Sequence, residues 1–185
     1  DETADPAIVA SDLLAQAEHD TDALPMLVAT DAALADAVDR EIETQSKTLA
    51  TADVATVAVG QGFTCVVDSI DDAVDLANHL APEHLEIITR DATGVASRIV
   101  NAGGLFIGAD AAEVVGDYGA GPNHTLPTGG AARHQAGLSV SHFLRLRTWI
   151  EVDDARGASV LFEDARALAA LEGLPAHAAS AARRS

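Results

Sequence analysis

Glu83 and His84 follow Pro82 and form the pair in this sequence best suited to moving protons. Because proline disfavours helical geometry in the residue before it, Pro82 should hold Ala81 extended and so fix the direction of the next two side chains. Glutamate and histidine have ordinary pKa values on either side of the useful range, so one can activate water while the other carries a proton. An exposed turn with a charged pair is the alternative interpretation.

Two further pairs of residues are candidates for holding a metal ion or a substrate. Gln16 and His19 lie three apart at the end of a predicted helix, so both side chains project from one face. Asp117 and His124 lie in a glycine-rich stretch, where the backbone can let a ligand approach closely. Asp117 is a candidate metal ligand, and His124 a candidate contact for a polar or anionic group. Glutamine is an unusual zinc ligand, because zinc usually takes histidine, cysteine or carboxylate.

Glu172 and His177 enclose a turn between two predicted helices, the second of which begins at Pro175. Ordinary polarity at helix ends explains this pair equally well. Cys65 lies in the apolar run FTCVV, which favours a buried, unreactive thiol over a nucleophile. Taken one at a time, all of these residues allow a zinc site or a carboxylate–imidazole site without requiring either.

The elements that would position these residues alternate between helix and strand. Apolar spacing predicts helices over 7–18, 29–50, 69–81 and near 91–100, and strands over 26–30, 54–59, 63–67, 85–89 and 104–108. Such alternation indicates an α/β layer with functional groups on loops at strand ends. We therefore expect an incomplete, Rossmann-like α/β domain of three layers over residues 1–137, which carries most of the site and whose sheet lacks strands.

Two of the predicted helices have clear start signals. Asp5 should cap the first helix, with Pro6 at its first position. Ser69 and Asp72 have the spacing of a capping box at the start of another.

The rest of the chain differs in composition. Residues 110–137 are rich in Gly, Pro, His and Thr and predict a long functional loop. A strand is expected over 141–152, followed by helices over 154–173 and 175–184, so that 138–185 would form a small, dimer-forming tail module. No G-x-G-x-x-G turn lies between a strand and a helix, so the residues themselves indicate no dinucleotide site.

The charge of the chain is strongly acidic. Its 185 residues carry a formal net charge of −18, and Lys47 is the only lysine, which disfavours nucleic acid as a partner. An acidic, lysine-poor, alanine-rich composition is also typical of salt-adapted proteins, so we expect a halophilic origin. No apolar run reaches the length of a membrane span and no leader is visible, so we expect a cytoplasmic protein without membrane contact.

Four segments, taken together and in order, resemble the histidinol dehydrogenase family: DLLAQAEHD, LAPEHLEI, GDYGAGPNHTLPTGG and EGLPAH. The similarity extends over essentially the whole chain. It implies a zinc enzyme of histidine biosynthesis in which Gln16, His19 and Asp117 bind the metal and contact the substrate. It also implies a homodimer with a shared site, in which His177 of the other subunit completes the zinc shell and Glu172 reaches the substrate across the dimer.

The resemblance further implies the reaction, in which L-histidinol is oxidised through L-histidinal to L-histidine with NAD. Glu83 would activate water and His84 would act as the acid and base. His84 and His124 would also contact the substrate. Zinc would hold the substrate and exchange no electrons, because it is redox-inert.

Family members are more than twice as long as this chain, and their preceding part contains the nicotinamide-binding domain. We therefore expect the NAD site to lie outside these residues and the isolated chain to have no dehydrogenase activity. Two alternatives remain open: a zinc-dependent hydrolase with Glu83 as base, and a non-catalytic zinc-binding dimerisation module.

Overall fold

The protein is described here by a computed structural model that covers residues 1–184. Two compact units divide the chain, Asp1–Phe143 and Leu144–Ser185, and each is described by itself. The domains predicted from the sequence, 1–137 and 138–185, stay a prediction.

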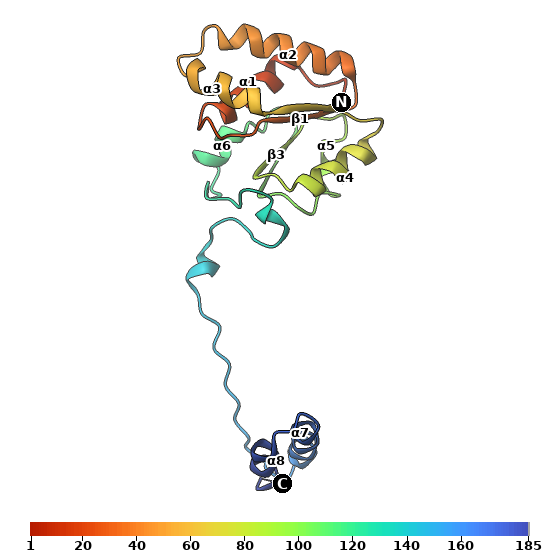
Figure 1. The fold of residues 1–185 in the computed structure, drawn as a ribbon, viewed down its shortest axis with the longest axis vertical. Helices are drawn as coiled ribbons and strands as arrows, with labels where there is room; N and C mark the ends of the chain where they lie inside the picture. Colours follow the sequence, from red (N-terminus) through yellow and green to blue (C-terminus); the bar gives the residue numbers. More distant parts are fainter. Residues whose placement is uncertain (185) are drawn as a thin grey trace. The chain divides into compact units, whose positions relative to one another are not determined.

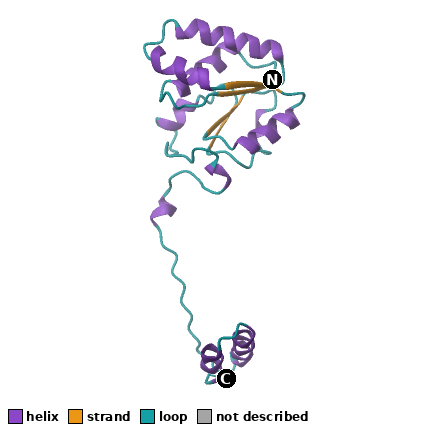
Figure 2. Ribbon diagram, viewed as in Figure 1, coloured by secondary structure: helices purple, strands orange, loops and turns teal. Residues whose placement is uncertain are grey.

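The first unit alternates helices and strands, which confirms the α/β class (Figures 1 and 2). Its elements are α1 (Pro6–Ala17), β1 (Met26–Ala29), α2 (Ala32–Ser46), α3 (Ala52–Gln61), β2 (Phe63–Val66), α4 (Ile70–Leu80), β3 (His84–Ile87), α5 (Ala92–Ala96), β4 (Gly104–Ile107), α6 (Glu113–Asp117), η1 (Ala131–Arg133) and η2 (Val140–Phe143).

The strands form two parallel pairs. β1 pairs with β2 so that Met26 faces Phe63, and β3 pairs with β4 so that His84 faces Gly104. Parallel neighbours need a crossover connection. Helices α2 and α3 supply it for the first pair and α5 for the second. In Figure 1, α1, α2 and α3 lie on one side of β1 and β2, and α4 and α5 lie on the other.

The helix starts follow their sequence signals. The carboxylate of Asp5 accepts a hydrogen bond from the backbone N–H of Ala7 at 2.8 Å, and Pro6 is the first residue of α1. The Ser69 hydroxyl accepts from the N–H of Asp72 at 3.1 Å and donates to its carboxylate at 2.6 Å. Both predicted caps are confirmed, and each satisfies an N–H group that the helix leaves unpaired.

The core lies mainly where α1 packs on α2 and α3. Its fully buried positions are small, which lets the helices approach closely; they include Ala10, Ala17, Val38, Ala55 and Ala58. Leu27 of β1 and Ile88, which follows β3, pack against the same core. Helix α1 is therefore held against both strand pairs.

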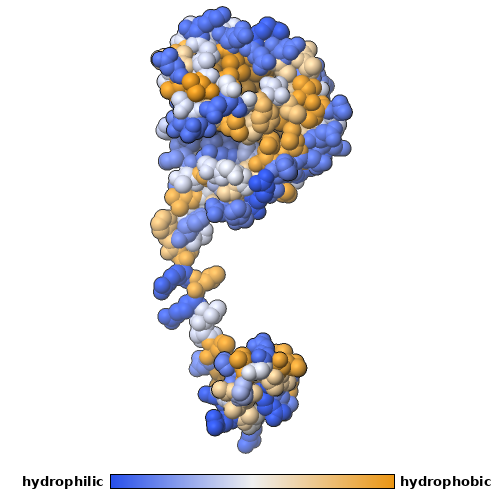
Figure 3. Space-filling model, viewed as in Figure 1, coloured by the Kyte–Doolittle hydropathy of each residue, from blue (hydrophilic) through white to orange (hydrophobic). Residues whose placement is uncertain are grey.

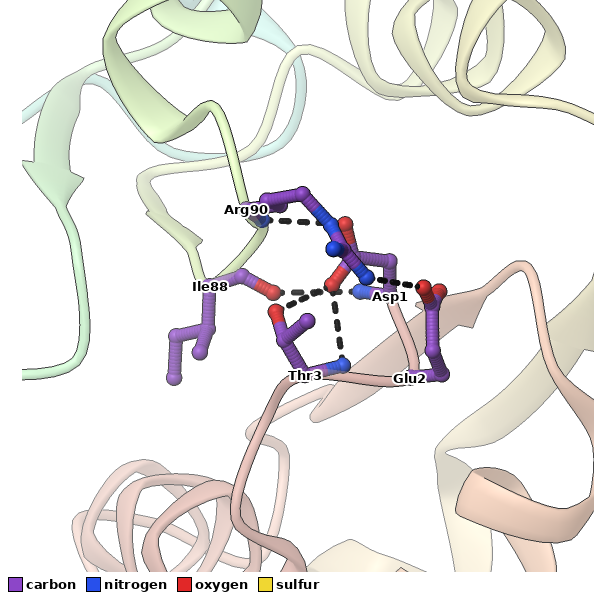
Figure 4. A network of polar contacts seen from close by, with 5 residues as sticks. All are labelled: Asp1, Glu2, Thr3, Ile88 and Arg90. Carbon is purple, nitrogen blue, oxygen red and sulfur yellow. Dashed lines mark hydrogen bonds and ion pairs between the residues drawn. The ribbon is translucent and has the colours of Figure 1, made fainter.

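A polar network also joins the segment before α1 to the loop after β3 (Figure 4). The amino group of Asp1 donates to the carbonyl of Ile88 at 3.1 Å, and the N–H of Arg90 donates to the Asp1 carboxylate at 2.9 Å. The Arg90 guanidinium pairs with Glu2 at 2.7 Å. The α1 segment and the end of β3 are thus joined by polar as well as apolar contacts.

Residues 54–59, predicted as a strand, lie in helix α3 instead. Ala55 and Ala58, three residues apart, are both fully buried and pack against α1. The valines of this segment favour a strand by their intrinsic propensity. A helix forms instead because it buries Ala55 and Ala58 together against α1.

The strand predicted over 141–152 is also wrong. Residues Val140–Phe143 form the turn η2, and 144–152 have no regular structure. A strand needs a neighbour to pair its backbone N–H and C=O groups, and this segment pairs with no strand in the described chain.

The second unit contains two helices that pack on each other, α7 (Ser159–Leu171) and α8 (Pro175–Ala182). Gly173 ends α7 with φ 73°, and the N–H groups of Gly173 and Leu174 donate to the carbonyls of Ala170 and Ala169. This is the Schellman pattern, which favours glycine at the left-handed position. None of the helices within residues 1–184 is long and apolar enough to cross a membrane.

Candidate functional site

The short helix α6 directs two carboxylates toward His84. Glu113 and Asp117 lie four residues apart, so they share one face of this helix. Glu113, Asp117 and His84 place one ligand atom each within 4.8 Å of one another. The closest pair is His84 Nε2 and Glu113 Oε1, which are 3.1 Å apart. These three groups form the centre of the candidate site.

The backbone around His84 is fixed by strand pairing. The N–H of Gly103 donates to the carbonyl of Pro82 at 2.9 Å, and that of Gly104 donates to the carbonyl of Glu83 at 2.8 Å. A Cβ atom at Gly103 would lie 2.5 Å from the Glu83 oxygen, so only glycine fits there. His84 therefore begins β3 in a defined position.

Ala81, expected to be extended before Pro82, is left-handed instead, with φ 50° and ψ 59°. The expectation was wrong because Ala81 also ends α4, where its N–H donates to the carbonyl of Ala77 at 2.9 Å. The following proline disfavours the right-handed helical region for this residue, and the left-handed conformation is common where a helix ends.

The ring of His84 packs against Phe106 of β4, with centroids 5.9 Å apart and planes inclined by 40°. Phe106 in turn leaves no room at Gly116 of α6, where a Cβ atom would lie 2.7 Å from the Phe106 ring. Gly116 thus allows α6 to approach the phenyl ring, and the phenyl ring supports one face of the imidazole.

Glu113 is the one charged or polar residue classed as buried among residues 1–184, with 5% of its surface exposed. Burial raises the pKa of its carboxyl, and Asp117 adds to this, whereas His84, His19 and Gln16 act in the opposite direction. Gln16, near the end of α1, therefore lies beside this carboxylate, whereas His19 acts on it only through its charge. Glu113 Oε1 and Gln16 Nε2 are buried without an aligned hydrogen-bond partner, although Oε1 lies close to His84.

A cavity of about 220 Å³ opens beside this cluster. Apolar side chains of β1, α4 and β3 form much of its wall, and the polar groups that reach it include Asp12, Gln16, His84, Glu86 and Glu113. An apolar cavity with a few converging polar groups is typical of a small-molecule site.

Asp12 of α1 and Glu86 of β3 form a carboxyl pair at this cavity. Burial, followed by the hydrogen bond and charge of Asp12, raises the pKa of Glu86 to about 8. Burial also raises the pKa of Asp12. Two interacting carboxylates in a buried place cannot both ionise easily, so the pair holds a proton near neutral pH.

The residues present fit a zinc ion. Gln16 has a buried amide without an aligned partner, and Asp117 offers a carboxylate in the cluster with His84 and Glu113. His19 is exposed and is not a member of this cluster. Histidine and carboxylate are ordinary zinc donors.

The other predicted site residues are not all brought together. Glu83 is half-buried next to His84, whereas His124 is exposed in the loop after α6. Glu172 and His177 are exposed in the second unit, Glu172 directly after α7 and His177 in α8. Cys65, expected to be buried, is half-buried in β2.

Sequence reasoning missed Glu113, Phe106 and the Asp12–Glu86 pair. Glu113 had one available signal, its spacing of four residues from Asp117, but the segment was interpreted as a loop. Asp12 lies one helical turn before Gln16, and Glu86 lies two residues after His84 on the strand. Both spacings place them on the same faces as the predicted site residues.

Comparisons with known proteins show which family the chain belongs to. A family model described as histidinol dehydrogenase matches residues 1–185. Proteins named histidinol dehydrogenase from Nitratidesulfovibrio vulgaris and Thermobifida fusca are 48% and 47% identical to the chain over its full length, which covers 42% of each. The relative of that name from Methanosarcina mazei is 43% identical over 97% of the chain and 41% of its own length.

A solved structure of histidinol dehydrogenase from Elizabethkingia anophelis is also similar, with a TM-score of 0.91 and 35% identity. The match covers 98% of this chain and 42% of that one. The chain thus spans about 42% of the length of the relatives it matches. With a family model that matches all of its residues and relatives above 40% identity, the chain belongs to the histidinol dehydrogenase family.

Proposed function

We propose that this chain is the zinc- and substrate-binding part of an NAD-dependent histidinol dehydrogenase. One observation supports this most directly: in a chain of this family, Gln16, His84 and Asp117 surround one buried carboxylate beside a cavity. The substrate is L-histidinol, an amino alcohol with an imidazole ring. The product is L-histidine.

Gln16, His19 and Asp117 would hold the zinc ion, and all three would also lie near the bound substrate. The metal, when bound, supplies a positive charge that holds and polarises the polar groups of the substrate, without exchanging electrons. His124 would contribute a further substrate contact from the loop after α6.

His84 takes the proton of the substrate hydroxyl while hydride leaves for NAD, which gives the aldehyde. Glu83 then takes a proton from the water that attacks this aldehyde, and His84 returns its proton to the aldehyde oxygen, so that the hydrate forms and His84 is again unprotonated. A second hydride transfer from the hydrate to a second NAD gives the carboxylate, and His84 again takes the hydroxyl proton. The two neighbouring residues thus divide water activation from proton transfer.

The NAD-binding part is proposed to lie outside these residues, so the isolated chain would not catalyse the reaction. Exposed apolar side chains on two strands support the view that the sheet is incomplete: Phe63 and Val66 of β2, and Leu105 and Ile107 of β4. Apolar surface on a strand is normally covered by another layer or strand.

A second copy of the chain would complete the site with His177 and Glu172. The segment around Trp149 supports this dimer, because Leu146, Trp149 and Ile150 are 103%, 78% and 91% exposed. Figure 3 shows apolar and charged side chains following one another along this extended segment. Such exposure of large apolar side chains is unusual in a monomer and favours an interface.

Calorimetric titration of L-histidinol into the zinc-loaded chain tests this proposal. We expect binding that requires zinc and is lost in His19→Ala. The matched control is His134→Ala, which removes an exposed histidine after η1. Absence of binding by a folded, zinc-loaded dimer would contradict the assignment of the substrate site to this chain.

A further inference from the structure

We propose that Glu113 is a positioning residue that holds the imidazole of His84 in one tautomer, with the proton on Nε2 and Nδ1 left as the base. This inference rests on the proposed role of His84 in proton transfer. It concerns a residue outside the predicted catalytic and ligand set, and its test needs neither substrate nor metal nor NAD.

The geometry points to Glu113 because its carboxylate lies at the edge of the ring. His84 Nε2 and Glu113 Oε1 are 3.1 Å apart, and the two side chains are 17% and 6% exposed. The atoms are close without being aligned as a hydrogen bond. Catalytic contacts of this kind are often poorly aligned without substrate and tighten when it binds.

Two further contacts restrict the ring. Strand pairing places the His84 backbone opposite Gly104, and Phe106 packs against the ring at 5.9 Å. The ring can therefore adjust by a small rotation toward Glu113 but has little freedom to turn away. Gly116 maintains this arrangement, because it lets α6, the helix that carries Glu113, lie close to Phe106.

The chemistry of the carboxylate determines which nitrogen carries the proton. An ionised carboxylate only accepts hydrogen bonds, whereas a neutral imidazole donates from one nitrogen and accepts at the other. A carboxylate at Nε2 therefore favours the tautomer with the proton on Nε2. Nδ1 is then unprotonated and free to take a proton from the substrate.

A competing role for Glu113 is direct metal binding, because His84, Glu113 and Asp117 lie close enough to share an ion. The two roles differ in whether they require a bound metal ion. A positioning residue acts on His84 without metal, whereas a ligand acts only when metal is bound.

The experiment is ¹⁵N NMR of the histidine rings in the metal-free chain at about pH 8, well above the ordinary histidine pKa of about 6.5. The His84 signals are assigned by their loss in His84→Asn. We expect the wild-type shifts to show a single tautomer with Nε2 protonated. Glu113→Met keeps the buried volume but removes the acceptor, so its His84 signals should move to those of a mixture of tautomers.

Glu113→Gln keeps an acceptor oxygen and should retain the Nε2-protonated form. Asp117→Asn is the matched control, because it neutralises the other carboxylate of α6 and should leave the His84 tautomer unchanged. Backbone amide spectra of each variant confirm the fold. An unchanged His84 tautomer in folded Glu113→Met would overturn the proposal.

Zinc titration of the same variants separates the competing role. Glu113→Met should retain zinc binding, whereas His19→Ala should lose it. Complete loss of zinc binding in folded Glu113→Met would make Glu113 a ligand and overturn the positioning role. Failure of the substrate titration leaves these results unaffected, because they use no substrate.

Discussion

Gly116 contributes to the site although it has no side chain. It lies between the two carboxylates of α6, and its missing Cβ leaves room for the Phe106 ring. Phe106 supports the imidazole of His84, so a change at Gly116 reaches the proposed base through one intervening ring. Glycine at position 116 therefore helps to position His84 although it contacts no substrate or metal itself.

Gly116→Ala should therefore destabilise the protein by ~1–3 kcal/mol, because the added Cβ forces the Phe106 ring or α6 to move. Gly60→Ala is the matched control. Gly60 lies in helix α3 with nothing within 4 Å of an added Cβ, so alanine should stabilise there by ~0.5–1 kcal/mol. Urea denaturation of both variants measures the difference, and equal effects at the two positions would contradict the role of Gly116.

Helix α1 and strand β3 between them carry much of the proposed machinery. Gln16 lies at the end of α1, with His19 just beyond it, and His84 begins β3. The Asp12–Glu86 pair joins these elements through carboxyl groups that hold a proton. The relative position of the proposed zinc ligands and the proposed base thus depends on how α1 and β3 lie against each other.

This pair predicts that the protein loses stability as the pH rises. Glu86 has a pKa of about 8 in the folded chain, against an ordinary value of 4.5. Between these values the folded state binds more protons than the unfolded state, so the free energy of unfolding falls as pH increases. The contribution is fully present below about pH 4.5 and is lost through about pH 8.

Thermal unfolding measured from pH 6 to pH 9 should show a falling Tm. Glu86→Gln cannot ionise and still offers hydrogen-bond donors, so it should show a flatter profile over this range. Glu43→Gln, an exposed glutamate of α2, serves as the control and should follow the wild type. Identical slopes for wild type and Glu86→Gln would rule out this source of pH dependence.

At the scale of the whole molecule, the dominant feature is the net charge of −18. Like charges on one surface repel, and salt screens this repulsion with a Debye length of ~10 Å at 0.1 M and ~3 Å at 1 M. We expect the free energy of unfolding to rise from dilute buffer to molar potassium chloride. Equal stability in both solutions would argue against salt adaptation.

The single tryptophan reports directly on association of the chain. Trp149 is 78% exposed and lies in the apolar segment proposed to meet a second copy. Its fluorescence emission should move to shorter wavelength as protein concentration rises, because dimerisation removes the indole from water. Sedimentation at the same concentrations shows the mass, and a dimer whose emission does not shift would place the interface elsewhere.

Local features of the chain were determined by the sequence alone. Asp5 and Ser69 start their helices because a side-chain oxygen can accept from N–H groups only a few residues away. Strands at 26–29, 63–66, 84–87 and 104–107 lie where short apolar runs predicted them. Glu83 and His84 could be chosen as candidates because they are adjacent in the sequence. The family resemblance was visible because the order of its four motifs can be read directly along the chain.

Tertiary structure decided the features that depend on contacts between distant residues. Residues 54–59 are helical because Ala55 and Ala58 find α1 to pack against, and 141–152 form no strand because none pairs with them in the described chain. Glu113 became a site residue only when α6 brought it to 3.1 Å from a histidine 29 positions earlier. Burial and proximity in space set its raised pKa and that of Glu86, and neither property is local in the sequence.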